Sequence, residues 1–444
     1  MTLPSLDTSR RLRMFAFTSF YVAQGIPLGL VTVALPAWLA SNGADAGAVG
    51  NFLAVATLPW AFKIVVGPLM DRFRFPSLGS RRPWVMAAMA GLLGTTLALV
   101  FLEISVEQIG LLTACCFVVN SFAAFQDVAV DGMAIEILAE EERGRANALM
   151  AFGQVASLSV FGAICGWTLP NLGMGWTAIV LSVAIAAILA IAVLVRERRG
   201  ERLLPWTDGS AQGSVATQSV SFVMIGRNLI HSLVLPASIV LICVTLCWRV
   251  SQGILVTAAP VLLTQNFGWT SEEYASWISI STLVAATLGI GAGFLIDRFG
   301  SRALYIWGLV FCAAVFFALW LTAPIWDQKI VWVIAMFAAN LGMQVVFVAL
   351  IAVHMSICWG VVAATQFALY MAWANFARSI GAKLYGEIAT FLEIGQEALL
   401  MGVLCLLSAG LVTRLNLQRH QARLSELSAE PGREGGAVDV PARY

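Results

Sequence analysis

Two acidic side chains lie one helical turn apart inside an apolar stretch of the chain. Asp127 and Asp131 are separated by four residues, so a helix places both carboxylates on one face. Two carboxylates this close oppose each other's ionisation, which suits a proton carrier. His354 lies in another apolar stretch and is a further candidate, because an imidazole titrates near neutral pH.

Structural roles for the same groups remain open. Asp131 lies near the predicted end of its helix, as does Glu136, where both can bind arginines of neighbouring loops: Arg72, Arg81, Arg82 and Arg145. Asp127 lies one turn deeper and fits either role. His354 stands among Ala, Val and Met, a setting that also fits a packed polar residue.

Three basic side chains occur where a charge is unfavourable. Lys63, Arg249 and Arg378 fall inside apolar stretches, where a charge at bilayer depth costs about 2.5–3.5 kcal/mol. Lys63 can pair with Asp127, bind an anionic substrate or extend to the membrane surface. Arg249 is our candidate for a substrate anion site, because a guanidinium binds a carboxylate or phosphate through two donors. Arg378 has no acid nearby on its own helix and can face the same site.

Several amides could bind a sugar or a peptide, and buried amides also join membrane helices by hydrogen bonds. The candidates are Gln24, Asn120, Gln252, Asn340, Gln344 and Asn375. Lys383 and Glu387 are four residues apart and are expected to pair with each other.

The eight cysteines are scattered without metal-binding spacing, and no phosphate loop or catalytic motif occurs. We therefore expect no metal, no cofactor and no catalytic residues.

The composition indicates a membrane protein. Hydrophobic residues make up 59% of the 444 residues and charged residues only 11%, whereas soluble domains carry about 25% charged residues. Apolar runs of roughly 20 residues recur, the length of a helix that crosses a bilayer. We expect an all-α membrane protein with twelve transmembrane helices, at 13–40, 46–70, 83–103, 107–137, 143–167, 174–196, 236–264, 272–296, 302–323, 329–357, 362–391 and 396–416.

A charged motif occurs twice, each time between two apolar runs. The first copy is Gly67-Pro-Leu-Met-Asp71-Arg72, followed by Arg81 and Arg82. The second copy is Gly293-Phe-Leu-Ile-Asp297-Arg298, followed by Arg302. Such a duplication indicates two homologous six-helix halves, as in secondary transporters. We expect an N-terminal half at 1–198, a polar linker at 199–235 with a short interfacial helix, a C-terminal half at 236–417 and a disordered tail at 418–444.

The basic residues predict the orientation. Assigning the N-terminus and every second loop to one side places 21 of the 26 Lys and Arg residues there, while the opposite loops hold only Lys329. Basic loops stay in the cytoplasm, so both termini are expected inside. The first apolar run lacks a cleavage site, so we treat it as a retained helix.

The two motif copies resemble the signature of the major facilitator superfamily, between helices 2 and 3 and between helices 8 and 9. A second stretch, Gln126-Asp127-Val-Ala-Val-Asp131 with the later Glu141-Glu142-Arg143-Gly144, resembles the AmpG-type muropeptide permeases and the acetyl-CoA transporters. Lys63 matches the same pattern, and so does Thr365-Gln366-Phe367-Ala368-Leu369. The resemblance runs along all twelve predicted helices.

The superfamily resemblance implies a cytoplasmic gate, in which the motif acids approach helix starts of the other half and the arginines bind loop acids. Here those residues are Gly67, Asp71, Arg72, Arg81, Arg82, Glu136, Arg145, Gly293, Asp297, Arg298 and Arg302. The motif glycines are expected to allow close helix contact. Anchoring of basic loops explains the arginines alone, but not two Gly-x-Leu-x-Asp copies.

The resemblance further implies a monomeric, proton-coupled importer in the bacterial inner membrane, working by alternating access. Its solute would be bulky and polar or anionic, with a muropeptide favoured, and nucleic acid is not an expected partner. The chain departs from the AmpG pattern at Arg249 and Gln252, where that subfamily tends to have a lysine and an aspartate. A siderophore or another organic anion, export instead of import, and a non-transporting membrane sensor or scaffold are the alternatives.

Overall fold

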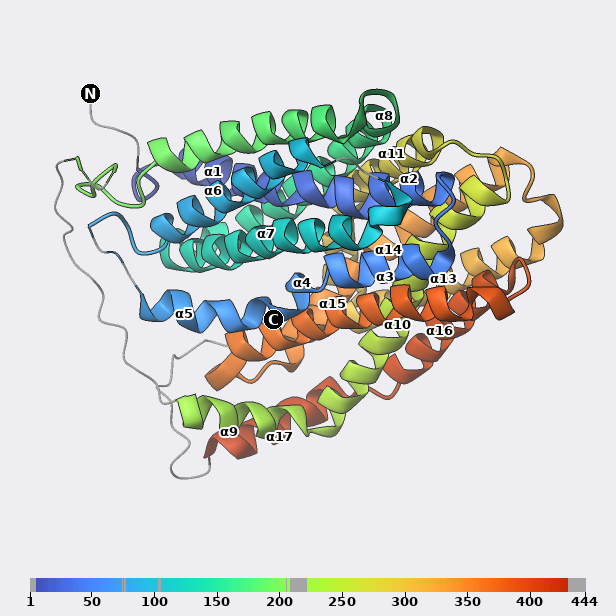
Figure 1. Ribbon diagram of the computed structural model, residues 1–444. Helices are drawn as coiled ribbons and strands as arrows, with labels where there is room; N and C mark the ends of the chain where they lie inside the picture. The colour runs from blue at the N-terminus through green and yellow to red at the C-terminus, as the bar shows by residue number, and fades with distance from the viewer. Residues whose placement is uncertain are drawn as a thin grey trace.

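The computed structural model describes residues 5–73, 75, 77–102, 105–204, 206–207 and 222–429 of the chain, and almost all of them are helical. The first group of helices is α1 (Arg10–Gly29), α2 (Leu35–Ser41), α3 (Ala46–Ala56), α4 (Pro59–Phe62), α5 (Val66–Arg72), α6 (Arg82–Ala98), α7 (Ile109–Ile137) and α8 (Glu140–Leu194). The second group is α9 (Phe222–Leu233), α10 (Pro236–Gln265), α11 (Ser271–Gly289), α12 (Ala292–Phe299), α13 (Ser301–Leu321), α14 (Lys329–Ile357), α15 (Ala363–Ile388), α16 (Gln396–Val412) and α17 (Leu417–Ala429). Figure 1 shows most of them as one elongated bundle of helices along a common direction.

The buried apolar side chains form two large clusters. One is built almost entirely from residues before 196, and the other almost entirely from residues after 240. Each helix group therefore packs around its own core, as two structurally equivalent halves would. The boundaries predicted for the halves and the linker remain predictions.

Within the described residues, seven helical runs are long and apolar enough to cross a membrane, or eight if the bent pair α16–α17 is one span. This count is lower than the twelve expected. One reason is that α8 has 55 residues and covers two predicted spans, divided at Gly173, whose φ is 81°. Another is that α15 carries Arg378, Lys383 and Glu387, while α16 has only 17 residues.

The predicted second span is broken into several pieces. Pro59 starts α4 only three residues after α3 ends, and a 3-10 turn, η2 (Lys63–Val65), separates α4 from α5. Proline lacks the N–H that would continue the ladder of an uninterrupted helix. The break places Lys63 in a turn, and not in the middle of a continuous helix as predicted.

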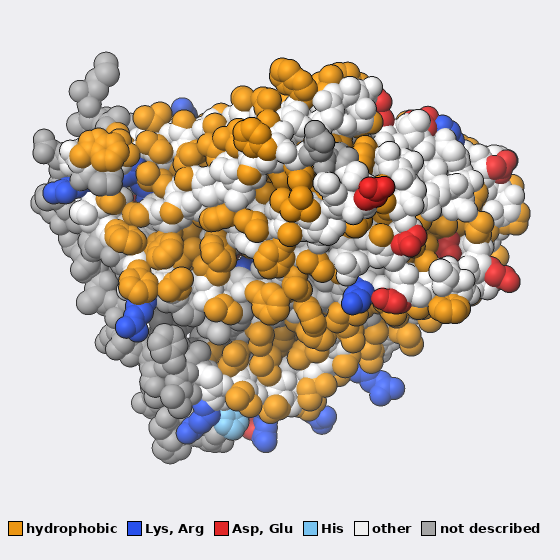
Figure 2. All heavy atoms as spheres, viewed as in Figure 1, with side chains coloured by type: hydrophobic (Ala, Val, Ile, Leu, Met, Phe, Trp, Pro, Cys, Tyr) orange, Lys and Arg blue, Asp and Glu red, His pale blue; other side chains and the backbone are white. Residues whose placement is uncertain are grey.

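The surface shows the polarity expected of a membrane protein. In Figure 2 apolar side chains cover the middle of the visible face, and most visible acidic side chains gather at its right-hand end. Most visible basic side chains lie toward the left and lower edges. This separation agrees with the uneven loop charges on which the predicted orientation is based.

Three close contacts join the two helix groups toward the acidic end. In α3, a Cβ added at Gly50 would lie 2.4 Å from the Ala382 carbonyl oxygen of α15. In α8, a Cβ at Gly166 would lie 2.2 Å from the Ala275 Cβ of α11. The Gln265 side chain of α10 donates hydrogen bonds to the backbone carbonyls of Ala40 (2.9 Å) and Ala44 (2.8 Å). Glycine at positions 50 and 166 is what lets the helices of the first two contacts approach.

At the opposite end, two arginines cap the ends of α8 and α16. Arg82 donates from Nε to the Ala192 carbonyl at the end of α8, at 3.0 Å, and from Nη2 to the Val193 carbonyl. Arg302 donates in the same way to the Val412 and Thr413 carbonyls at the end of α16. A guanidinium there supplies donors to carbonyls that have no intrahelical partner and opposes the negative end of the helix dipole.

Two acids complete the first cap. The Glu197 carboxylate accepts the backbone N–H groups of Ser80 (2.8 Å) and Arg81 (2.7 Å), and also that of Arg82. Glu201 is buried, and its Oε2 accepts the Arg198 N–H at 3.0 Å. Burial raises the pKa of Glu201 to about 7, and the nearby Glu197 adds to the rise.

The linker and the tail are partly helical. Helix α9 falls within the interfacial helix expected near 222–235. The tail was expected to be disordered from 418, but Leu417–Ala429 forms α17, and 430–444 lie outside the described residues. Helix α17 is ordered because Leu424 packs with Trp359 and Val362, and the His420 imidazole bonds the Ile357 carbonyl at 2.9 Å.

We expect Gly50→Leu to lower the thermal unfolding midpoint of the detergent-purified protein. The side chain would meet the α15 backbone, and overpacking of this kind costs about 1–3 kcal/mol. Gly94→Leu is the matched control, because that helical glycine of α6 has nothing within 4 Å of an added Cβ. Equal shifts in the two variants would show that the α3–α15 approach is not tight.

The raised pKa of Glu201 predicts a pH-dependent stability. Between its ordinary value of 4.5 and about 7, the folded protein holds a proton that the unfolded chain has lost, so stability falls as pH rises through this window. Glu201→Gln should therefore raise the unfolding midpoint at pH 8 and leave it nearly unchanged at pH 4.5. Glu141→Gln, at an exposed position, should change neither. An equal gain from Glu201→Gln at both pH values would contradict the assignment.

Candidate functional site

The first charged centre is an ion pair between the broken helix and α7. Lys63 Nζ lies 2.5 Å from Asp127 Oδ2, and the Asp127 residue is only 3% exposed. Of the three roles left open for Lys63, pairing with Asp127 is the one observed. The Lys63 ammonium also lies 5.8 Å from the centroid of the Trp60 ring, a cation–π distance.

The second carboxylate of α7 has a different partner. The Tyr21 hydroxyl, from α1, donates a hydrogen bond to Asp131 Oδ1. The expectation that Asp131 binds a loop arginine is therefore wrong in this structure, whereas Glu136 does bind Arg81, at 3.0 Å. Sequence reasoning missed Tyr21, because a tyrosine in an apolar helix has no spacing that marks it. Its phenol in a stretch with other polar groups was the only available signal.

The third group is Arg249 in α10, which is buried and binds only uncharged oxygens. Its Nε donates to the Ala374 carbonyl at 3.0 Å and its Nη2 to Asn375 Oδ1 at 3.2 Å, while Nη1 donates to Gln252 Oε1. Gln252 and Asn375, both predicted for the substrate site, are thus brought together by the arginine. The guanidinium has no carboxylate partner among the described residues.

Arg378 lies one turn after Ala374 and Asn375 on α15. It is partly buried, and its side chain makes no hydrogen bond or ion pair with the described residues. An added Cβ at Gly253 of α10 would lie 2.1 Å from the Arg378 carbonyl, so the two helices touch there. Arg249 and Arg378 therefore place two positive charges in one region without a described acid to balance them.

A chain of hydrogen bonds connects these groups across the two clusters. Asn375 Nδ2 donates to the Trp60 carbonyl at 3.3 Å, and Trp60 Nε1 donates to Asn120 Oδ1 at 3.0 Å. The ring of the same Trp60 lies beside Lys63. Contacts thus run from Arg249 through Asn375 and Trp60 to the Lys63–Asp127 pair.

The remaining predicted residues lie apart from this chain. Gln24 accepts a hydrogen bond from Gln154 Nε2 at 2.7 Å, and Gln344 packs against Gly289. His354 is fully buried, and its ring nitrogens lie near the Leu350 carbonyl (2.7 Å) and the Thr245 hydroxyl (3.3 Å). These are the surroundings of a packed polar side chain.

Among the gate residues, Arg81, Arg82 and Arg302 make their described contacts within their own helix group. Arg82 and Arg302 cap helix ends, while Arg72, Arg145 and Arg298 are exposed. The close contact expected at the motif glycines is absent for the described neighbours: the nearest atom to a Cβ at Gly67 would be 3.9 Å away, and nothing lies within 4 Å at Gly293. The side chains of Asp71 and Asp297 lie outside what the structure describes.

The expected pair of Lys383 and Glu387 is also not formed. Both side chains are exposed on α15, where water solvates each charge separately. Exposed ion pairs of this kind contribute little, so the helix gains almost nothing from forming one.

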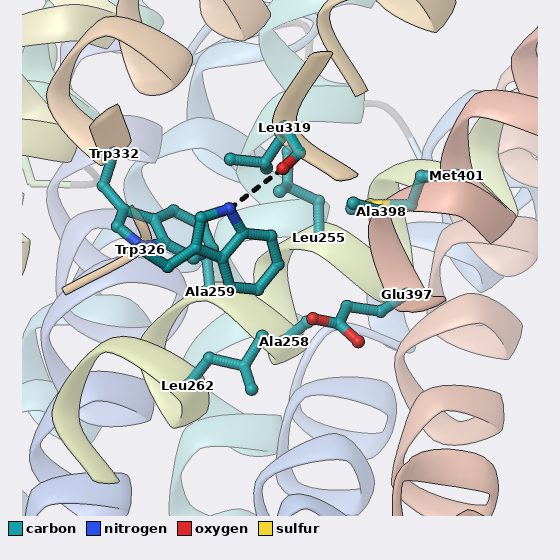
Figure 3. Close-up of a pocket in the computed structure, with 10 residues that line it drawn as sticks. All are labelled: Leu255, Ala258, Ala259, Leu262, Leu319, Trp326, Trp332, Glu397, Ala398 and Met401. Carbon is teal, nitrogen blue, oxygen red and sulfur yellow. Dashed lines mark hydrogen bonds between the residues drawn. The ribbon is translucent and has the colours of Figure 1, made fainter. Parts of the chain in front are cut away.

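A small cavity in the second cluster does not belong to this site. It holds about 10 Å³, space for one water at most. Figure 3 shows Glu397 of α16 reaching it among mostly apolar side chains, including Trp326 and Trp332. The Glu397 carboxylate accepts the Gly395 N–H at 3.1 Å. The cavity is too small for a transported solute.

Solved structures identify the fold. The chain resembles the crystal structure of a D-xylose–proton symporter with a TM-score of 0.70 and 14% identity, covering 91% of this chain and 97% of that one. It resembles a peptide transporter POT, solved with sulfate, with a TM-score of 0.68 and 11% identity, covering 96% and 98%.

Sequence relatives are closer. An anhydromuropeptide permease of Escherichia coli (strain K12) is 28% identical over 359 residues, which is 80% of this chain and 70% of that protein. The putative transporter AmpG 4 of Rickettsia conorii is 23% identical over 378 residues, or 80% and 85%. These matches confirm the predicted resemblance to the AmpG-type permeases.

The family model for the Major Facilitator Superfamily matches residues 14–384. Proteins of this family are transporters and not enzymes, so the expectation of an all-α, multi-pass membrane transporter is confirmed. With this match over most of the chain, the protein belongs to the Major Facilitator Superfamily.

Proposed function

We propose that the protein is a proton-coupled importer of a bulky anionic solute, with an anhydromuropeptide as the favoured substrate. It would act as a monomer in the inner membrane of a bacterium, with both termini in the cytoplasm. The single observation that carries the proposal is the pair Arg249 and Arg378. Two arginines in membrane-spanning helices, with no described acid to neutralise them, are unfavourable unless a ligand supplies the negative charge.

Twelve membrane crossings are consistent with the helices. Helix α8 supplies two crossings, one on each side of Gly173. The broken series α3–α5 supplies one, and so does the pair α11–α12. The segment α1–α2 and helices α6, α7, α10, α13, α14, α15 and α16 supply one each.

The described conformation fits a transporter open toward the cytoplasm. The close contacts at Gly50, Gly166 and Gln265 lie toward the acidic end, which the charge distribution assigns to the outside. At the other end, a Cβ added at Gly67 would meet only Val128, at 3.9 Å, and nothing lies within 4 Å at Gly293. We infer that Gly67 and Gly293 acquire close neighbours when the cytoplasmic side closes.

Coupling between solute and proton has a physical route in the hydrogen-bond chain. An anion bound by Arg249 would compete with Asn375 Oδ1 for the guanidinium N–H donors. Asn375 also bonds the Trp60 carbonyl, three residues before Lys63. A shift of Asn375 would therefore displace the turn that carries Lys63 and change the distance between Lys63 and Asp127.

The substrate class rests on the sequence relatives and on the site. Anhydromuropeptides combine sugar hydroxyls with peptide carboxylates, which suit amides and arginines respectively. Gln252 and Asn375 supply amides beside Arg249. A siderophore or another organic anion would use the same arginines and is the runner-up.

Substrate stabilisation and uptake test the proposal together. Purified protein would be heated with rising concentrations of an anhydromuropeptide, a ferric siderophore or an acyl-CoA, and a bound ligand raises the unfolding midpoint. The expected result is stabilisation by the anhydromuropeptide and its accumulation in proteoliposomes driven by a pH gradient. Stabilisation by another compound alone would replace the substrate. Stabilisation without accumulation under any gradient would favour a sensor.

Removing the guanidinium should weaken substrate binding. Arg249→Ala is expected to lower the affinity for the anhydromuropeptide at least tenfold, which is about 1.4 kcal/mol. Arg249→Lys keeps the charge but loses the forked donors, so an intermediate loss is expected. Arg423→Ala, an exposed arginine of α17, is the control. A dissociation constant for Arg249→Ala within twofold of the wild-type value would remove Arg249 from the site.

A further inference from the structure

The two carboxylates of α7 have unequal partners. Asp127 forms an ion pair with Lys63 at 2.5 Å. Asp131 receives its hydrogen bond from the uncharged hydroxyl of Tyr21. One cation therefore faces two acids on the same helix face, and it neutralises the deeper one.

The charged groups that face Asp131 come from several helices. Arg72 of α5, which also packs on α7, is exposed, and the side chain of Asp71 lies outside what the structure describes. Tyr21 comes from α1, Lys63 from η2 and Asp127 from α7 itself. Arg81, before α6, lies beside Gly132, where an added Cβ would be 3.0 Å from its guanidinium carbon. That arginine already pairs with Glu136, at 3.0 Å. Asp131 is thus the carboxylate of this group that forms no ion pair among the described residues.

Asp127 and Asp131 also differ in how far they are exposed. Asp127 is 3% exposed, whereas Asp131 is partly exposed. A group that exchanges protons with water needs a route to it, and Asp131 has more contact with the surroundings. A carboxylate without a cation in an apolar bundle is also the one that gains most from protonation.

We propose that Asp131 carries the coupled proton and that Tyr21 is the positioning residue that holds its carboxyl group, while Asp127 stays ionised against Lys63. The assignment rests on the proposed proton coupling and specifies its site. One proton adds to a carboxylate oxygen of Asp131 and leaves from the same atom, and no other bond changes. The Tyr21 hydroxyl binds Oδ1, which leaves Oδ2 to take the proton.

The role of Tyr21 follows from where it comes from. It anchors Asp131 to α1, and α1 packs closely against α8, where an added Cβ at Gly25 would lie 2.3 Å from the Gln154 carbonyl. Protonation of Asp131 removes the negative charge that attracts the phenol. The α1–α7 link therefore depends on whether the proton is bound, which is what a coupled transporter requires.

Infrared spectroscopy of the substrate-free protein in lipid tests the assignment without a transport assay. All proteins carry Glu201→Gln, because Glu201 would otherwise give a titrating carboxyl band of its own. In this background the protein should show a protonated-carboxyl band that disappears as pH rises, and Asp131→Asn should lose it. The double variant Lys63→Met/Asp127→Asn removes the ion pair without changing net charge and should keep the band. Loss of the band in the double variant with retention in Asp131→Asn would overturn the assignment, and so would an unchanged band in both.

Tyr21→Phe tests the positioning role. The carboxyl band should change frequency, because the Asp131 group loses its hydrogen bond. In proteoliposomes the alkaline limb of anhydromuropeptide uptake should move by about 0.4–1 pH unit toward higher pH, the size expected for one hydrogen bond. A merely structural role for Tyr21 would lower the unfolding midpoint and leave both the band and the pH profile in place.

Transport assays distinguish the proposed substrate from the assignment of the proton to Asp131. Asp131→Asn should lose proton-driven accumulation of the anhydromuropeptide and keep counterflow exchange, which needs no net proton movement. If wild type fails to accumulate this solute while the Asp131 band titrates as expected, the substrate proposal fails and the proton assignment stands. If wild type accumulates it and Asp131→Asn does so equally well, the proton assignment fails.

Discussion

The cost of a charge in an apolar bundle governs the arrangement of the whole site. Lys63 and Asp127 meet that cost by pairing at 2.5 Å, and the pairing depends on the break at Pro59 that puts Lys63 in a turn. Arg249 meets it with three neutral oxygens. Arg378 and Asp131 are left with less. We assign the proton to Asp131, and the solute to Arg378 together with Arg249. The residues to which we assign a function are those whose charge is least balanced by neighbouring groups.

Sequence reasoning succeeded where this cost leaves few choices. A lysine and an acid in apolar stretches have few alternatives to each other, so pairing with Asp127 was one of the three roles predicted for Lys63, and it is the one observed. The superfamily could be predicted from two copies of one motif. The partner of Asp131 could not, because a phenol in an apolar helix looks like any other packed aromatic. The helix-capping roles of Arg82 and Arg302 could not either, since their acceptors are backbone carbonyls, which every residue carries. The count of twelve was read from hydropathy, which registers each apolar run but not how two helices join at Gly173 or where Pro59 breaks the second span.

The two capping arginines change how the repeated motif is understood. Each copy supplies an exposed arginine, Arg72 or Arg298, and a later one that binds the carbonyls at the end of α8 or α16. The later arginine ties the third helix of a half to its sixth, so each half keeps its shape as it moves. Rigid halves are what a rocking mechanism needs, and the remaining motif residues are free to change partners between conformations.

The Gln265 side chain has a consequence for turnover. It bonds two carbonyls, of Ala40 and Ala44, next to the aqueous end of the bundle. When that end separates, water can replace both bonds, and a hydrogen bond exchanged for one to water is worth only about 0.5–1.5 kcal/mol. The glycine contacts below it lose dispersion energy that water does not restore. The kinetic barrier to reopening toward the outside should therefore be set by backbone packing at Gly50 and Gly166. The Gln265 amide would orient the two helix groups when they meet and would add little to that barrier.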